Sequence, residues 1–239
     1  MYEYQKRIGF SECDTTKHLT ITALVDAFQD CSTFQSEDLG VGFDVLERQH
    51  LVWVINYWEI QIDSLPQLCD HVTVGTFPYS FKTCFGQRNF YMKDREGRYL
   101  VKANSMWTLI DSETVKPTRT PSFISEAYTI EPKLDMSYNS RKVLIPSDEG
   151  LAVIRKDPIR IQEHHLDSNR HVNNGQYVKI AMAQIEDHNL DRLRIDYRKQ
   201  AVLGDIIYPV VYENGSERVV ALEDENKEPY SVSQYILKQ

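Results

Sequence analysis

Three polar side chains that could carry out acid–base chemistry lie at every second position of one short segment. Asp167, Asn169 and His171 would project on the same side of an extended chain, because successive side chains of a strand alternate between its faces. Histidine is well suited to act as a general base near neutral pH, and an asparagine amide can donate hydrogen bonds to a developing oxyanion. The segment therefore predicts a hydrolytic centre in which Asp167 orients one of the other two groups.

Asn173, Asn174 and Gly175 follow directly and open a segment with helical periodicity. The free backbone N–H groups and the positive dipole end of that helix could face the same oxyanion. A structural interpretation stays open beside this one. In it, one of the two asparagines caps the helix, while Asp167 and His171 close a satisfied turn.

His164 and His165 lie close to this segment and are also residue types that bind metals. Adjacent histidines usually point in different directions, and the sequence contains no evident second cluster of ligands. We therefore expect neither a metal nor another cofactor.

The elements around these residues follow from hydrophobic periodicity and proline content. Apolar residues recur mostly every three or four positions across 21–39, which predicts a long helix with Thr20 available as its cap, and a second helix is predicted over 175–187. Prolines interrupt residues 112–158, so a long connector is expected there. Segments rich in β-branched and aromatic residues predict strands over 51–62, 71–77, 85–94, 99–111, 192–202, 205–213, 217–230 and 231–239.

The two halves of the chain repeat each other. Asp14 and His18 precede the first helix at the same spacing as Asp167 and His171 precede the second. Two copies of a helix-plus-sheet unit predict an α+β fold, with units at 1–125 and 151–239 joined by a connector at 126–150. The first copy has Thr16 in the place of Asn169, so we expect it to be structural.

Residues 166–177, LDSNRHVNNGQY, resemble the D-x-N-x-H-V-N-N-x-x-Y signature of acyl-acyl carrier protein thioesterases. The resemblance implies two fused hotdog units, each a long helix wrapped by a curled antiparallel sheet. It also implies that Asp167, Asn169 and His171 form the catalytic centre, while the first unit forms the acyl pocket.

The sequence departs from the plant members of this family at two positions. They continue the tyrosine-arginine stretch with a glutamate and a catalytic cysteine, whereas this chain has Gln200 and Ala201. A cysteine nucleophile is therefore absent there, which favours attack by water activated at His171, with Gln200 positioning the water. Two alternatives stay open: an acyl-coenzyme A thioesterase, and a non-catalytic protein that binds acyl thioesters.

Composition limits the partners and the location. The chain carries 27 Lys and Arg against 35 Asp and Glu, a net charge of −8, which argues against nucleic-acid binding through a basic surface. We expect acyl carrier protein as the partner, the protein being a monomer or a homodimer. Separated cysteines and the lack of a long apolar run predict a soluble, cytoplasmic protein without a membrane span. Docking of an acidic carrier would use basic residues such as Arg88, Lys93, Arg95, Arg98, Arg198 and Lys199.

Overall fold

The computed structural model describes residues 1–147, 150–167, 170–187 and 189–238. The chain divides into two compact units. The first comprises Met1–Asn56 and Ile60–Tyr138, and the second comprises Tyr57–Glu59 and Asn139–Gln239. Within the described part of the chain, no helix is long and apolar enough to cross a membrane.

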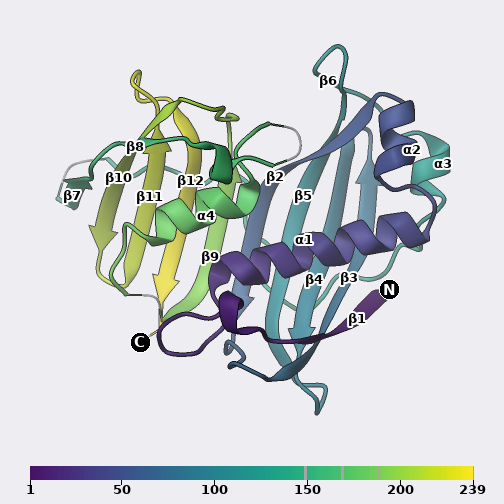
Figure 1. Ribbon diagram of the computed structural model, residues 1–239, viewed down its shortest axis with the longest axis horizontal. Coiled ribbons are helices and arrows are strands. Elements are labelled where there is room, and N and C mark those ends of the chain that lie inside the picture. Colours follow the sequence, from purple (N-terminus) through teal and green to yellow (C-terminus); the bar gives the residue numbers. More distant parts are fainter. Residues whose placement is uncertain (148–149, 168–169, 188, 239) are drawn as a thin grey trace. The chain divides into compact units, whose positions relative to one another are not determined.

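The first unit is an antiparallel sheet with one long helix against it. The helix α1 (Ile21–Asp38) buries Leu24, Val25 and Phe28 completely and begins at Thr20, whose hydroxyl accepts the Ala23 N–H at 3.2 Å. Figure 1 shows α1 lying across the strands. The strand order is β1 (Tyr2–Arg7), β3 (His71–Lys82), β4 (Phe85–Lys93), β5 (Tyr99–Asp111) and β2 (Leu51–Ile62), with β6 (Lys116–Pro117) paired to β5.

Three short helices complete this unit: η1 (Phe10–Glu12), α2 (Phe43–Arg48) and α3 (Ser122–Ser125). The core between α1 and the sheet contains the rings of Phe28 and Phe90, whose centroids are 5.3 Å apart. The aromatic residues that make the strands favourable therefore also form the packing surface for the helix.

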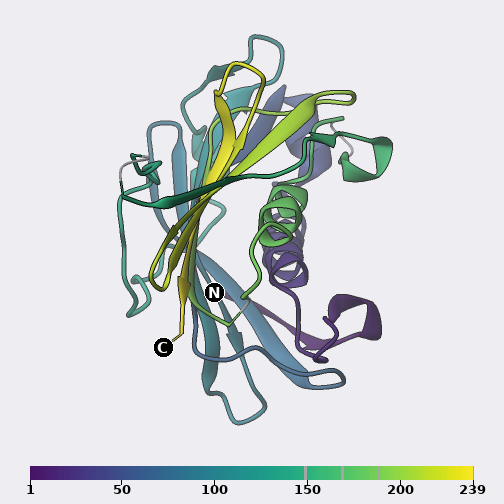
Figure 2. The same ribbon diagram turned by 90° about the vertical axis from the view of Figure 1, so that its left-hand side faces the viewer.

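The second unit repeats this plan with a shorter helix. Figure 2 shows α4 (Asn174–Met182) lying against one face of the strands. The 3₁₀ helix η2 (Glu163–His165) precedes α4. The strand order is β9 (Leu190–Tyr197), β12 (Pro229–Leu237), β11 (Glu217–Glu223), β10 (Ile206–Asn214) and β7 (Ala152–Arg155), with β8 (Ile159–Arg160) paired to β10.

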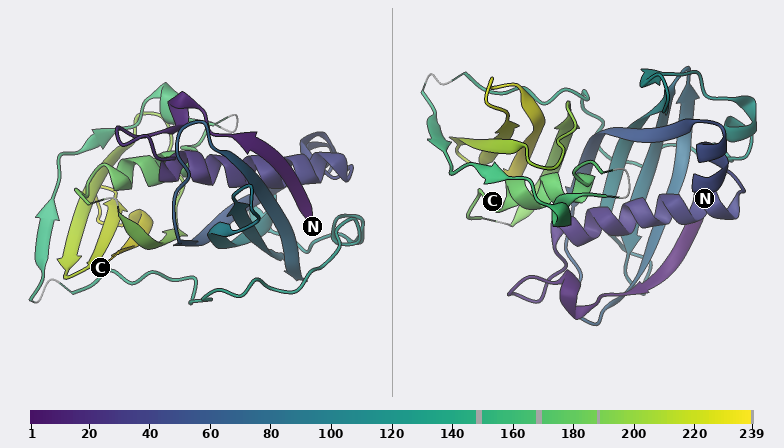
Figure 3. Two further views of the ribbon diagram at one scale, coloured as in Figure 1. Left: turned by 90° about the horizontal axis from the view of Figure 1, so that it is seen from below. Right: turned by 45° about the horizontal axis from the view of Figure 1, so that its top comes forward.

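The connector covers the other face of the second sheet (Figure 3, left view). Val143 is 1% exposed and packs with Val210, Tyr212 and Val219 of the strands. This segment is anchored by Glu59, a fully buried carboxylate that accepts the Asn139 backbone N–H at 2.8 Å. The connector is therefore attached to the second unit at Asn139 and Val143.

The predicted fold class is confirmed, as are most of the elements. The predicted strands 51–62 and 99–111 match β2 and β5 exactly in their bounds, while β1 was not predicted. The second helix ends at Met182 and not at residue 187, because the N–H groups of Gln184 and Ile185 bond to carbonyls only three residues back. Tightening of this last turn shortens α4.

Candidate active site

Asp167 and His171 are hydrogen-bonded to each other and do not lie along one extended strand as we expected. Asp167 N–H donates to the His171 carbonyl at 2.9 Å, and His171 N–H donates to Asp167 Oδ1 at 3.3 Å. Arg170 takes a left-handed conformation, with φ of 62°. Among the described contacts, the Asp167 carboxylate therefore closes a turn that ends at His171. Asn169 lies outside the described residues.

This turn pairs with a second segment, residues 200–202, which is distant in sequence and is called the receiving segment below. His171 lies opposite Val202 in an antiparallel bridge, and Val172 N–H donates to the Ala201 carbonyl at 3.0 Å. Gln200, which is exposed, directly precedes this bridge. The structure therefore brings His171 and Val172 next to Ala201 and Val202, while the predicted role of Gln200 stays a prediction.

Tyr177 of α4 holds the receiving segment in place. Its buried hydroxyl accepts the Ala201 N–H at 2.8 Å, and burial raises its pKa, so the group stays a neutral phenol. Asp205 closes the same segment by accepting the Val202 N–H at 3.0 Å. Tyr177 belongs to the motif, and this contact gives it a structural role that was not predicted from the sequence.

The start of α4 is capped by Asn173. Its side-chain oxygen accepts the Gly175 N–H at 2.8 Å, and its carbonyl accepts the Gln176 N–H at 2.9 Å. Asn174 is the first helical residue, and its carbonyl accepts the Tyr197 hydroxyl at 3.1 Å. The capping interpretation therefore describes Asn173 well, and only the NH₂ group of its side chain is left as a donor for a ligand.

His165 has a structural role in the turn before the motif. Its Nδ1 accepts the Gln162 N–H at 3.0 Å, and its ring lies 4.1 Å from that of His164. Burial lowers the pKa of His165, and the nearby His164 and Lys179 lower it further. The described residues contain no group of three or more side chains that could hold a metal ion.

The first unit contains a second copy of this turn. Asp14 N–H donates to the His18 carbonyl at 2.9 Å, and His18 N–H donates to Asp14 Oδ1 at 3.1 Å. Lys17 has φ of 67°, and Leu19 N–H donates to the Pro66 carbonyl at 2.9 Å. Each contact has its equivalent in the second unit, so the predicted internal repeat is confirmed at the level of single hydrogen bonds.

The segment that pairs with each turn also repeats, although the sequence did not predict this second repeat. Asp70 Oδ2 accepts the Gln67 N–H at 2.8 Å, as Asp205 does for Val202. The shared Leu-x-Asp spacing, Leu68 with Asp70 and Leu203 with Asp205, was the signal that could have revealed it.

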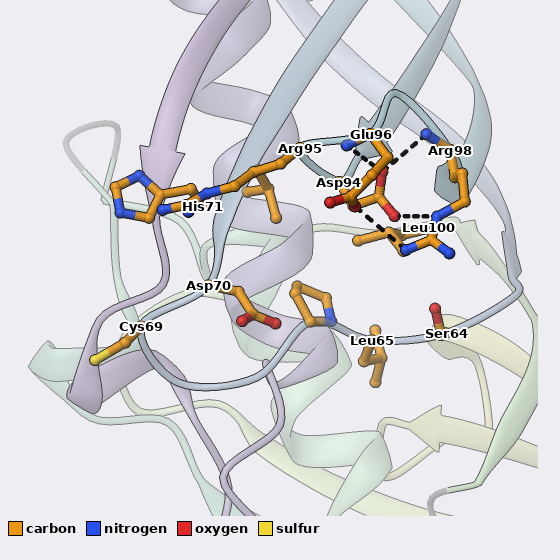
Figure 4. A pocket seen from close by; sticks show the side chains of 12 residues that line it. Ser64, Leu65, Cys69, Asp70, His71, Asp94, Arg95, Glu96, Arg98 and Leu100 are labelled. Carbon is orange, nitrogen blue, oxygen red and sulfur yellow. Dashed lines mark hydrogen bonds and ion pairs between the residues drawn. The ribbon is translucent and has the colours of Figure 1, made fainter.

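A pocket of about 420 Å³ borders the receiving segment of the first unit (Figure 4). Its wall mixes both signs of charge, and Arg98 donates to Asp94 at 2.6 Å within it. An acyl chain needs a mostly apolar wall, so this pocket is not the expected acyl site. Its charged lining residues are Asp70, His71, Asp94, Arg95, Glu96 and Arg98.

Comparison with known families gives two matches that together cover most of the chain. Residues 1–128 match the acyl-ACP thioesterase N-terminal domain, and residues 151–234 match the acyl-ACP thioesterase C-terminal domain. These matches confirm the resemblance found in the motif.

Individual relatives agree with this. The chain is 25% identical over 228 residues to oleoyl-acyl carrier protein thioesterase 2, chloroplastic, of Arabidopsis thaliana; the match covers 88% of this chain and 62% of that protein. The chain therefore spans less than two thirds of the length of this plant relative.

Two solved structures share the fold over nearly their whole length. An acyl-ACP thioesterase from Bacteroides thetaiotaomicron superposes with a TM-score of 0.88 at 22% identity, covering 99% of this chain and 97% of the other. The 12:0-ACP thioesterase from Umbellularia californica gives a TM-score of 0.84 at 18% identity, covering 98% and 96%. The predicted double-hotdog fold is confirmed by these superpositions.

Proposed function

We propose, from the premise that this chain belongs to the acyl-ACP thioesterase family, that it hydrolyses the thioester of an acyl-acyl carrier protein to release a free fatty acid. The observation that carries the proposal is the histidine turn of the second unit. There, a half-buried His171 lies beside the helix start and the segment 200–202.

In this proposal His171 is the general base. Its imidazole takes a proton from water as the water oxygen attacks the thioester carbonyl carbon. The tetrahedral intermediate then collapses, the carbon–sulfur bond breaks, and the imidazolium returns the proton to the departing thiolate. Asp167 acts as a positioning residue, because its carboxylate and backbone close the turn that carries His171.

The oxyanion is stabilised by side-chain amides. Asn169 donates to it, joined by Asn174 and by the NH₂ group of Asn173. The backbone N–H of Gly175 contributes less than we expected, because the Asn173 cap already accepts it. Gln200 positions the attacking water, since it can both donate and accept hydrogen bonds but has no carboxylate to act as a base.

The first unit is proposed to form the acyl pocket. Aromatic rings gather inside it: those of Trp53 and Phe81 are 6.1 Å apart, and those of Phe81 and Tyr128 are 5.6 Å apart. Gly86 permits this packing, because a Cβ there would lie only 3.2 Å from both Trp53 and Phe81. Such a wall suits a hydrocarbon chain.

Acyl carrier protein is the proposed partner, but the docking surface differs from the one we expected. Arg88 is excluded from it, because its guanidinium donates to Gln35 and lies 5.5 Å from the Phe90 ring. Other basic residues have acidic neighbours, which weakens their pull on an acidic carrier. These pairs are Arg98 with Asp94, Arg198 with Asp196, and Lys199 with Asp224.

The test is steady-state release of free thiol from acyl-acyl carrier proteins of several chain lengths, with matched acyl-coenzyme A esters run in parallel. The proposal predicts a higher kcat/KM for the carrier-protein ester of the same acyl group. A preference for coenzyme A would instead identify an acyl-coenzyme A thioesterase. Acyl binding without turnover would identify the non-catalytic binding protein, an outcome that Gln200 and Ala201 keep open.

The proposed location is the cytoplasm, where thiols stay reduced. Cys13, Cys31, Cys69 and Cys84 are all free. Cell fractionation tests the location, and sedimentation of the purified protein decides between the monomer and the homodimer.

A further inference from the structure

The two histidines of the repeated turns have different hydrogen-bond surroundings. Thr16 Oγ1 lies 2.9 Å from His18 Nδ1, and Gln67 Nε2 lies 3.3 Å from His18 Nε2. By contrast, no residue that the structure describes hydrogen-bonds the ring of His171, whose backbone N–H is bonded to Asp167. Among the described residues, side chains therefore bond both ring nitrogens of His18 and neither ring nitrogen of His171.

The contacts of His18 fix its tautomer. The Thr16 hydroxyl donates to Asp14 Oδ1 at 2.7 Å, so its oxygen accepts from His18 Nδ1–H. The Gln67 amide nitrogen can only donate, so His18 Nε2 must accept. The lone pair that a general base would use is thus occupied by the Gln67 amide.

The capping residue occupies one defined position. Gln67 lies directly opposite His18 across an antiparallel bridge, and Val202 lies directly opposite His171 across the equivalent bridge. Side chains at such opposed positions share one side of the pair and lie within contact distance. Val202 is aliphatic and 43% exposed, so it has no group that could occupy the imidazole.

We propose that Val202 is a positioning residue of the catalytic site, which leaves the imidazole of His171 open, and that the residue opposite each histidine decides whether that turn can act as a base. This inference rests on the proposed function only for its consequence on turnover. The capping itself is a property of the two turns and can be measured without substrate.

The test is to place the cap of the first turn into the second with Val202→Gln. We expect a new hydrogen bond to His171 Nε2, visible as a changed ring-nitrogen signal in ¹⁵N NMR, and a fall in kcat/KM of at least about 10-fold. Leu203→Gln is the matched control, because it adds the same side chain one residue further along, at a position that is 52% exposed. This control is expected to change neither the ring signal nor the turnover.

The reciprocal variant is Gln67→Val, which should release the ring of His18 and change its nitrogen signals. If the ring-nitrogen signals of His171 are unchanged in Val202→Gln, the inference is overturned, whether turnover falls or not. Unchanged ring-nitrogen signals of His18 in Gln67→Val would overturn it as well. If the wild-type protein shows no turnover, the proposed function fails. The ring-nitrogen signals of the two histidines still show whether the opposed glutamine caps the ring.

Discussion

The two histidine turns share a backbone and differ in chemistry. Both turns have a left-handed residue before the histidine, Lys17 in one and Arg170 in the other, and both are closed by an aspartate. They differ in the side chains around the ring, where Gln67 caps His18 and Val202 leaves His171 uncapped. The same turn therefore presents its histidine to different side chains, and we expect these side chains to decide whether the imidazole can act as a base.

The helices that follow the two turns differ in length. α1 runs from Ile21 to Asp38 and buries a long apolar face, whereas α4 runs only from Asn174 to Met182. The first unit therefore has the longer apolar helix face, while the second has the histidine that no described side chain caps. This division of labour supports the proposed placement of the acyl pocket and the catalytic centre in different units.

Removal of the aspartate should destabilise both turns but lower the activity only when the aspartate belongs to the second turn. We expect Asp167→Ala to lower kcat/KM about 10- to 100-fold, because the turn that positions His171 loosens. Asp14→Ala should leave kcat/KM unchanged, although each variant loses about 1 kcal/mol of unfolding free energy. Thiol-release kinetics and urea denaturation of both variants check this, and an equal loss of activity in the two would break the comparison.

The helix caps provide a second matched pair. Thr20→Ala and Asn173→Ala should each lower the free energy of unfolding by about 1 kcal/mol, because each side chain accepts a backbone N–H of its helix. Only Asn173→Ala should also lower kcat. Activity lost at residue 173 without any loss in urea stability would show that the capping assignment is wrong.

The left-handed residues should respond alike. Lys17→Gly and Arg170→Gly are each expected to raise the free energy of unfolding by about 0.5 kcal/mol, because glycine adopts positive φ without the steric cost of a Cβ. Thermal and urea unfolding measure the change. Stabilisation of one turn but not of the other would show that the two backbones are less equivalent than their hydrogen bonds indicate.

The pH dependence of the free energy of unfolding should differ between the units by a small amount. The reason is one position at which the first unit has Glu12 and the second has His165. Glu12 Oε2 accepts the Gly9 N–H at 2.7 Å, and His165 Nδ1 accepts the Gln162 N–H in the same way. The pKa of His165 is lowered on folding, first by burial, so the unfolded chain binds more protons between the folded pKa and about 6.5.

The free energy of unfolding should therefore decrease as the pH falls through about 6.5 and level off below the folded pKa. His165→Gln should remove this component, whereas Glu12→Gln should leave it in place. Urea denaturation across about three pH units, from about pH 5 to about pH 8, measures the pH dependence of the unfolding free energy in both variants. A slope that His165→Gln leaves intact would assign the titration to another group.

Most of the fold followed from local patterns. β-Branched and aromatic runs predicted β2 and β5 to the residue, and periodicity predicted α1, because these elements bury one continuous face. β1 was missed because its apolar positions are tyrosines separated by charged residues. The end of α4 was missed because hydrophobic spacing continues through Ile185, although the backbone has already tightened.

The geometry of the candidate site could not be predicted from the residue types of its motif. The spacing of Asp167, Asn169 and His171 suggested an extended chain, since period two is typical of strands, and the left-handed Arg170 could not be foreseen from an arginine. The contact of Tyr177 with Ala201 joins a helix to a segment more than twenty residues away. Only the tertiary structure specifies such a contact.

The chemistry of the two turns can be compared directly by measuring kcat/KM for one acyl-acyl carrier protein with wild-type protein, His171→Ala and His18→Ala. We expect a loss of about 10²- to 10⁴-fold for His171→Ala, the usual contribution of a general base, and a value for His18→Ala within about twofold of wild type. Full activity in His171→Ala, or an equal loss in His18→Ala, would contradict the assignment of the chemistry to the second turn.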